Sequence, residues 1–151
     1  MTMAGVSQKC QYGLRALLEL AKRYGEGFVK VGEIARAQAI PVRFLTVILA
    51  ELRQGEFVVS RRGAEGGYRL ARSPESLTVG EVIRFIEGPM APVECLAAGR
   101  GKTCPLRERC AFMGMWRRAR DAVAHVYDST SFRDLLEAEA AAGAYVPSYC
   151  I

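Results

Sequence analysis

Apolar residues in the first third of the chain recur at helical spacing, in three stretches divided by short breaks. A stripe at intervals of three and four positions predicts an amphipathic helix over residues 7–23, and a shorter one predicts a helix over 31–38. Pro41 is suited to a first helical turn, so a third helix is expected over 41–54. Only residues 39–40 separate the second helix from the third, which predicts a helix-turn-helix.

The segment after the third helix has the pattern of two short strands joined by a glycine-rich loop. Phe57–Ser60 and Tyr68–Leu70 are the expected strands, and Arg61 and Arg62 lead into the loop. Glycines there can adopt the positive φ angles that a tight hairpin needs. A hairpin that directly follows a helix-turn-helix is interpreted as a wing.

Capping residues predict the start of a fourth helix. Thr78 and Glu81 have the spacing of a capping box, and Leu77 with Val82 has that of a hydrophobic staple. Gly88 and the proline after it are expected to end this helix.

A long helix is predicted over 111–127, and a short last helix is expected to begin near Ser131. Apolar residues of the long helix recur at spacings of 4, 3, 4 and 3, which is close to the 3.5-residue period of a coiled-coil seam. The seam residues are Phe112, Trp116, Ala119, Val123 and Val126. A single amphipathic helix cannot bury such a seam alone, so a homodimer is predicted; packing on the chain's own core is the alternative.

These elements predict a mainly α fold with a small β-hairpin wing, that is, a winged helix-turn-helix followed by a long C-terminal dimerisation helix. Three segments are expected. Residues 1–88 form the DNA-binding domain, 89–110 a cysteine-rich cluster-binding loop, and 111–151 the dimerisation helix and C-terminal tail.

Composition limits the class of protein. The 151 residues carry a formal net charge of +5 and include no apolar run long enough to span a membrane, and the N-terminus lacks the pattern of a signal peptide, which predicts a cytoplasmic protein. Seven Arg face three Glu between Arg36 and Arg72, whereas one Arg faces four acids from Asp128 onward. A basic segment of this kind favours a polyanion partner, although a solvated basic face would look the same.

Three of the five cysteines lie close together in the pattern C-x8-C-x5-C, at Cys95, Cys104 and Cys110. Cysteines in a reducing compartment favour metal binding or redox chemistry over a disulfide framework. Thiolates are soft ligands for zinc or an iron–sulfur cluster, and bare thiols near arginines can also respond to oxidants. Cys150 is expected to be free.

Candidate DNA contacts follow from the helix-turn-helix. The N-terminal residues of its second helix enter the major groove, where Arg can pair with guanine and Thr can contact thymine. Arginines of a wing can enter the minor groove or contact phosphates. The predicted contacts are Arg43, Phe44, Thr46 and Val47 on the helix, Arg61, Arg62, Arg69 and Arg72 on the wing, and Arg36 on the preceding helix.

The chain resembles the IscR/NsrR/RirA group of bacterial regulators, the Rrf-two family, from about Ser7 to Leu136. The resemblance rests on SQKCQYGLRALLELA, on the stretch IPVRFLTVILAELRQGEFVVSRRGAEGGYRLARSPESLTVGEVIRFIEG, and on TSFRDLLE after the long helix. It implies a winged-helix dimer that controls transcription at a pseudo-palindromic operator and often holds a [2Fe–2S] or [4Fe–4S] cluster. On that match Cys95, Cys104 and Cys110 are the cluster ligands, and Arg62 is the wing arginine.

The fourth cluster ligand departs from the family pattern. IscR-like members place a histidine three residues after the last cysteine, where this chain has Met113. NsrR-like members use an acid near the N-terminus of the partner subunit, where this chain has Gln11, with Cys10 beside it. Gln11 or Cys10 of the partner, or Met113, are therefore the candidates.

The resemblance favours a cluster-based sensor of nitric oxide, oxygen, redox state or iron, and two other classes of function are possible. The same DNA-binding regulator with a zinc site or a cluster-free thiol site is the alternative, since three cysteines plus one further ligand also satisfy tetrahedral zinc. An enzyme or electron carrier is disfavoured, because the sequence has no nucleotide-binding or hydrolase motif and only one histidine for acid–base work.

Overall fold

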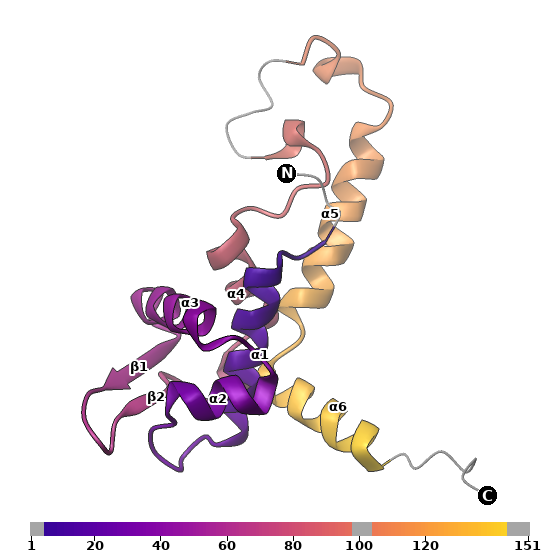
Figure 1. The fold of residues 1–151 in the computed structure, drawn as a ribbon. Helices are drawn as coiled ribbons and strands as arrows, with labels where there is room; N and C mark the ends of the chain where they lie inside the picture. Colours follow the sequence, from indigo (N-terminus) through magenta and orange to yellow (C-terminus); the bar gives the residue numbers. More distant parts are fainter. Residues whose placement is uncertain (1–4, 98–103, 145–151) are drawn as a thin grey trace, which may run out of the picture.

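The computed structural model describes residues 5–97 and 104–144, and it is mainly helical with one two-stranded hairpin (Figure 1). The α-helices are α1 (Gln8–Lys22), α2 (Val31–Gln38), α3 (Val42–Gln54), α4 (Val79–Glu87), α5 (Met113–Asp128) and α6 (Phe132–Ala144). The strands are β1 (Val58–Arg61) and β2 (Gly67–Leu70), and short 3-10 turns are η1 (Pro74–Ser76), η2 (Glu94–Leu96) and η4 (Arg107–Arg109). The predicted fold class is confirmed, with helix ends within two residues of those expected.

Helix α1 lies at the centre of a compact head and packs against α2, α3, α4 and α6. Leu17 of its apolar stripe is fully buried and belongs with Ile34 of α2, Leu49 of α3 and Val82 of α4 to one continuous core. Burial of this stripe is the main stabilising contribution to the head.

The turn of the helix-turn-helix is as short as the sequence predicts. Ala39 ends α2 in the left-handed conformation, with φ at 49°, and the N–H of Ile40 donates to the Ala35 carbonyl at 2.9 Å. This pattern satisfies the last turn of α2 and redirects the chain at once into α3.

The wing pairs β1 with β2 in antiparallel register, from Val58 opposite Leu70 to Arg61 opposite Gly67. A third short segment joins it, because Val29 and Tyr68 exchange two backbone hydrogen bonds of 2.8 Å. Gly67 has φ at 143°, and a Cβ there would lie 2.2 Å from the Val29 carbonyl oxygen. Glycine is therefore required where the wing meets the segment before α2.

Helix α4 begins with the predicted capping box. The Thr78 hydroxyl accepts from the Glu81 N–H at 3.3 Å, and the Glu81 carboxylate accepts from the Thr78 N–H at 2.9 Å. Leu77 and Val82, the expected staple, are both fully buried.

The chain leaves the head after α4, and helix α5 forms an arm whose C-terminal end reaches the head, where α6 begins (Figure 1). Phe132 at the start of α6 is fully buried, and its N–H donates to the Leu77 carbonyl at 3.0 Å. Lys22 of α1 reaches Glu139 of α6 at 2.9 Å. The segment 111–151, expected from sequence as one unit, thus supplies both the arm and a part of the head core; its end, 145–151, lies outside the described residues.

Candidate DNA-binding and sensing sites

The N-terminal half of α3 presents one face to solvent. Val42, Phe44 and Val47 are about half exposed, whereas Leu45 and Ile48 on the opposite side of the helix are buried. Of the exposed apolar residues, Phe44 and Val47 are among those that the sequence assigns to DNA contact. The helix therefore offers an uncovered surface suited to a major groove.

Two polar residues on this face are already oriented. The Arg43 guanidinium lies 4.6 Å from the centre of the Phe44 ring, a cation–π contact that holds it beside the helix. The Thr46 hydroxyl donates to the Val42 carbonyl at 2.9 Å, which leaves its methyl group and lone pairs for a base edge.

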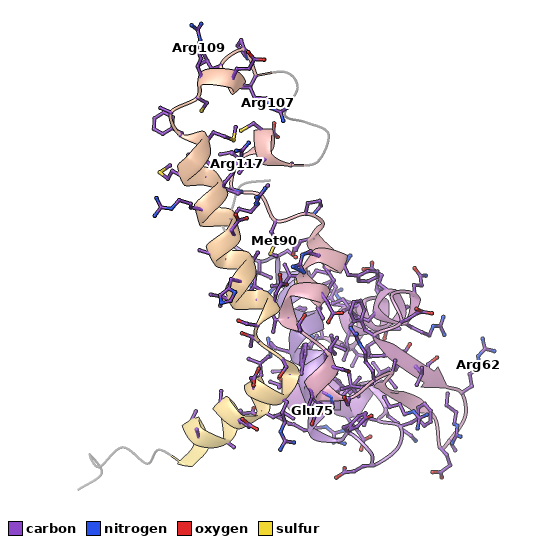
Figure 2. The ribbon with its side chains drawn as sticks, turned by 180° about the vertical axis from the view of Figure 1, so that it is seen from behind. Arg62, Glu75, Met90, Arg107, Arg109 and Arg117 are labelled. Carbon is purple, nitrogen blue, oxygen red and sulfur yellow. The ribbon has the colours of Figure 1, made fainter. Side chains whose placement is uncertain are left out.

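The arginines of the wing take two different positions. Arg62 extends from the wing tip away from the body of the molecule (Figure 2). Arg61 and Arg69 instead lie over the ring of Phe28, each with its guanidinium carbon 4.8 Å from the ring centre. Sequence reasoning did not single out Phe28, because it falls in a connecting segment without periodicity. Arg36 of α2 is exposed.

Arg72 joins the wing to α4 instead of standing free. Its guanidinium donates to the Glu81 carboxylate at 2.8 Å. One turn further along α4, Arg84 forms an ion pair with Asp128 at the end of α5. A Cβ at residue 80 would collide with the Asp128 side chain, so Gly80 makes this approach possible. Ion pairs thus link the wing, α4 and the base of the arm.

The three clustered cysteines all lie in the connection between α4 and α5, at the far end of the arm from the wing (Figures 1 and 2). Cys95 is in η2, Cys110 follows η4 just before α5, and Cys104 is exposed at the edge of the described segment. Within residues 5–97 and 104–144, no three His, Cys, Asp or Glu side chains are close enough to hold a metal ion. The structure places the thiols on one loop but does not bring them together into a closed site.

Positive charge surrounds Cys104. A hollow beside it is lined by Arg107, Arg109 and Arg117 together with Glu108. Thiolates are soft ligands for zinc and for iron–sulfur clusters. The chemistry of this donor set therefore fits a thiolate-bound metal or cluster.

The candidates for a fourth ligand occupy different environments. Cys10 is fully buried, and burial, followed by the negative charge of Glu87, raises the pKa of its thiol to about 12. A neutral thiol inside the core is a poor ligand for a partner subunit. Gln11 is exposed, and its side-chain amide donates to the Val6 carbonyl at 2.9 Å. Met113 is half-buried in the first turn of α5, three residues after Cys110.

Helix α5 contains no buried residue among its described positions. Phe112, Met115 and Val126 are 62%, 48% and 59% exposed, and with Ala119 and Ala122 they repeat at spacings of 3, 4, 3 and 4. The stripe expected from sequence is divided, because Val123 turns toward the head while Phe112 and Val126 face outward.

The sequence matches the model of the Rrf2 family, described as an iron-dependent transcriptional regulator, over residues 6–138. The chain belongs to the Rrf2 family. It is 40% identical over 130 residues to the HTH-type transcriptional regulator CymR of Bacillus subtilis, a match that covers 86% of this chain and 88% of CymR. The regulator NsrR of Geobacillus kaustophilus is 35% identical over 127 residues, covering 84% of this chain and 86% of NsrR.

Solved structures agree with this assignment. The structure of CymR, the global cysteine regulator of B. subtilis, superposes with a TM-score of 0.73 at 39% identity, covering 88% of this chain and 96% of that one. T. potens IscR superposes with a TM-score of 0.74 at 31% identity, covering 97% and 96%. This Rrf2 chain is thus a winged-helix transcriptional regulator, and its relatives are regulators, not enzymes. Among its described residues, no helix has the length and apolar character needed to cross a membrane.

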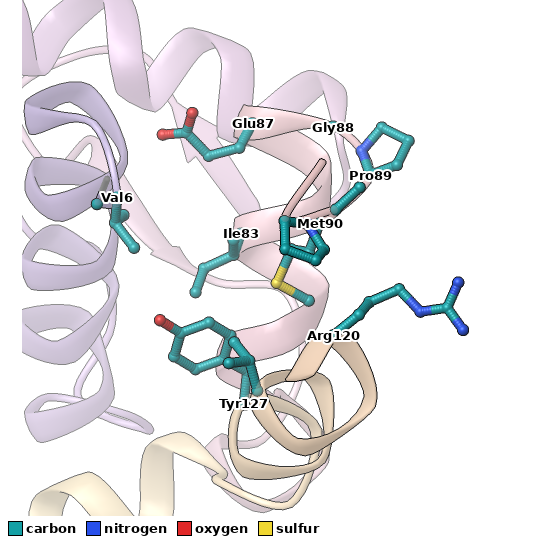
Figure 3. A pocket seen from close by; sticks show the side chains of 12 residues that line it. Val6, Ile83, Glu87, Gly88, Pro89, Met90, Arg120 and Tyr127 are labelled. Carbon is teal, nitrogen blue, oxygen red and sulfur yellow. The ribbon is translucent and has the colours of Figure 1, made fainter. Parts of the chain in front are cut away.

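The Rrf2 chain also contains a cavity of about 310 Å³ where the head, the cysteine connection and the arm meet (Figure 3). Ile83 of α4, Met90 of the connection and Tyr127 of α5 line it, and Arg120 points its guanidinium outward from the rim. The arm therefore meets the head beside an apolar cavity, next to the ion pair between Arg84 and Asp128.

Proposed function

We propose that this chain acts in the cytoplasm as a homodimer that binds a pseudo-palindromic operator, with an affinity set by an iron–sulfur cluster on Cys95, Cys104 and Cys110. The observation that carries the proposal is the placement of three thiols on the connection from α4 to α5, which leads from the DNA-binding head into the arm. On this proposal 1–88, 89–110 and 111–151 serve as reading, sensing and dimerisation segments, with Phe132 fastening the third segment to the first.

DNA binding is supported by the uncovered face of α3 and by the basic wing. Arg43, Phe44, Thr46 and Val47 would face base edges, Arg62 the minor groove, and Arg36 the phosphate backbone. Phosphate contacts release counterions, so affinity should fall steeply as salt rises.

A second copy of the chain is the partner proposed for the outer face of α5. Phe112, Met115 and Val126 form an apolar face with the spacing of a coiled-coil seam. Two such faces joined about a two-fold axis would present two α3 helices to successive half-sites. Sedimentation velocity of Val126→Asp should show a monomer where the wild-type chain shows a dimer, since the change places a charge in the seam.

The cluster proposal assigns three thiolates of one subunit as ligands. Met113, or the exposed Gln11 of the partner subunit, is the candidate for the fourth ligand. A bound cluster would supply an iron centre that reacts with oxygen or nitric oxide and is lost when iron is scarce. What this chain contributes is the loop that holds it, directly before the first turn of α5. The printed family description, an iron-dependent regulator, is consistent with this assignment.

A zinc site or a bare thiol switch is the second candidate. Cys104 is exposed and so accessible to oxidants, and Arg107, Arg109 and Arg117 line the hollow beside it. The relative CymR is described as a cysteine regulator, and a structure of Staphylococcus aureus CymR is described as an oxidised form. Three thiols plus one further ligand also satisfy tetrahedral zinc.

Anaerobic purification followed by visible spectroscopy and iron, sulfide and zinc assays separates these candidates. Charge-transfer absorption with stoichiometric iron and sulfide, lost in Cys104→Ala and kept in Cys10→Ala, is the expected result. The Cys10 variant is a matched control, because that thiol is buried in the head core. Protein that stays colourless after reconstitution, or equal operator affinity with and without the cluster, would contradict the cluster proposal.

A further inference from the structure

Phe28 is fixed at the base of the wing although it belongs to the connection between α1 and α2. The next residue, Val29, is buried and pairs with Tyr68 of β2 through two 2.8 Å hydrogen bonds. Gly67 packs directly on the Val29 carbonyl. Because the backbone on its C-terminal side is held in this way, the half-buried Phe28 ring has a defined position beside the hairpin.

Two arginines of the wing meet on this one ring. The guanidinium carbons of Arg61 in β1 and Arg69 in β2 each lie 4.8 Å from the centre of Phe28, so they are no farther apart than twice that distance. Like charges repel, and exposed arginine side chains lose rotamer freedom when they are held. The negative face of an aromatic ring offsets both costs by attracting a cation.

The register explains why these two residues converge. Arg61 is paired with Gly67, and Arg69 lies two positions beyond Gly67 on the same strand. Side chains two positions apart along a strand lie on the same face, so Arg61 and Arg69 are diagonal neighbours on one face of the hairpin. Arg62, the next residue after Arg61, extends from the tip instead (Figure 2).

We propose that Phe28 positions Arg61 and Arg69 as a paired guanidinium site that grips one DNA phosphate, beside the groove that Arg62 enters. This site rests on the proposed DNA-binding function and specifies which residues of the wing contact a phosphate. Guanidinium groups present planar donor forks that match phosphate oxygens, and two of them held close together give one anion several charge-assisted hydrogen bonds. Arranging them before DNA arrives removes part of the ordering cost of binding.

The proposal separates two roles within the wing. Arg62 is the residue that reaches into the groove and responds to its width. The Phe28 site holds the wing against the phosphate backbone of the DNA and contributes no base preference of its own. Loss of Phe28 should therefore weaken binding to every sequence by a similar factor.

The test uses the full-length chain and a 30-base-pair duplex that the wild-type protein enriches from a randomised library at low salt. Ethylation interference maps the phosphates that matter, and binding is measured across a range of potassium chloride concentrations. The variants are Arg61→Ala, Arg69→Ala, the double variant, Phe28→Leu and Phe28→Tyr. Tyr24→Ala, at an exposed aromatic residue of the same connection, is the matched control.

One phosphate in each half-site should lose its interference signal in Arg61→Ala, in Arg69→Ala and in Phe28→Leu. Phe28→Leu should bind roughly tenfold more weakly, because two exposed cation–π contacts each contribute a few-fold effect. Phe28→Tyr keeps the aromatic face and should bind as wild type, as should Tyr24→Ala. The double arginine variant should reduce the salt slope by about one phosphate contact, not two.

Circular dichroism of Phe28→Leu verifies that the head is folded, since leucine keeps the apolar contacts of the position. Wild-type affinity and an unchanged interference pattern in folded Phe28→Leu would overturn the paired site. So would loss of two different phosphates in the two single arginine variants. If the wild-type protein enriches no duplex at all, the DNA-binding function itself fails, and the phosphate site fails with it.

Discussion

Replacing Phe132 by alanine should open the core of the head, because its ring is fully buried against the other helices. Truncation of a buried phenylalanine costs about 3–5 kcal/mol, through lost transfer free energy and the cavity left behind. This is a large part of the roughly 5–15 kcal/mol by which folded domains are stable. At about 2–4 °C per kcal/mol for a chain of this size, the melting temperature should fall by roughly 6–20 °C.

The matched control is Phe112→Ala, the same chemical change at a position that is 62% exposed. Both variants are melted by far-UV circular dichroism over a hundredfold range of protein concentration. Phe132→Ala should be destabilised by a similar amount at every concentration, because the core lies within one subunit. Any loss in Phe112→Ala should depend on concentration, since it would act through association. A Phe132→Ala protein that melts with the wild type would refute the view that α6 closes the head.

Four further outcomes are expected. As pH rises from 9.0 toward 12, unfolded Cys10 deprotonates while the buried thiol stays neutral, so wild-type stability should fall. The unfolding free energy of Cys10→Ala, measured with urea, should lack this loss at high pH. The same pH dependence in the variant and the wild type would argue against a role of the Cys10 thiol. Thr78→Ala removes the α4 cap and should cost about 1 kcal/mol in the urea midpoint analysis, with an unchanged m-value. Arg43→Ala should weaken binding to the preferred base by about 1–3 kcal/mol and relax preference there, whereas Arg62→Ala should chiefly reduce discrimination of minor-groove width, both read from competition with single-base operator variants.

Local signals in the sequence located the elements well. The capping box at Thr78, the two-residue turn after α2 and the glycine-rich hairpin each encode their structure within a few neighbouring residues. Backbone conformation and capping at such points depend on adjacent side chains alone, so a single sequence is enough to find them. The exposed and buried faces of α3 were separable for the same reason, since helical period assigns them.

Contacts between distant segments were not encoded in this way. Helix α5 carries apolar residues on more than one face, and only the position of α4 decides that Val123 turns inward. Phe132 gave no periodic signal that it would join a core built from the first half of the chain. The meeting of Phe28 with Arg61 and Arg69 depends on the pairing of Val29 with the wing, which is a tertiary contact.

Because Phe132 completes the core of the head, the head can finish folding only after most of the chain has been synthesised. Translation proceeds from the N-terminus, so the helix-turn-helix and wing are synthesised well before the aromatic ring that completes their core. A growing chain therefore acquires its cysteine loop and its arm before its head is finished. A chain truncated within the arm would lack Phe132, so the core of its head would be incomplete and open to proteases. Such a fragment would not persist as a folded DNA-binding head without its cysteine loop.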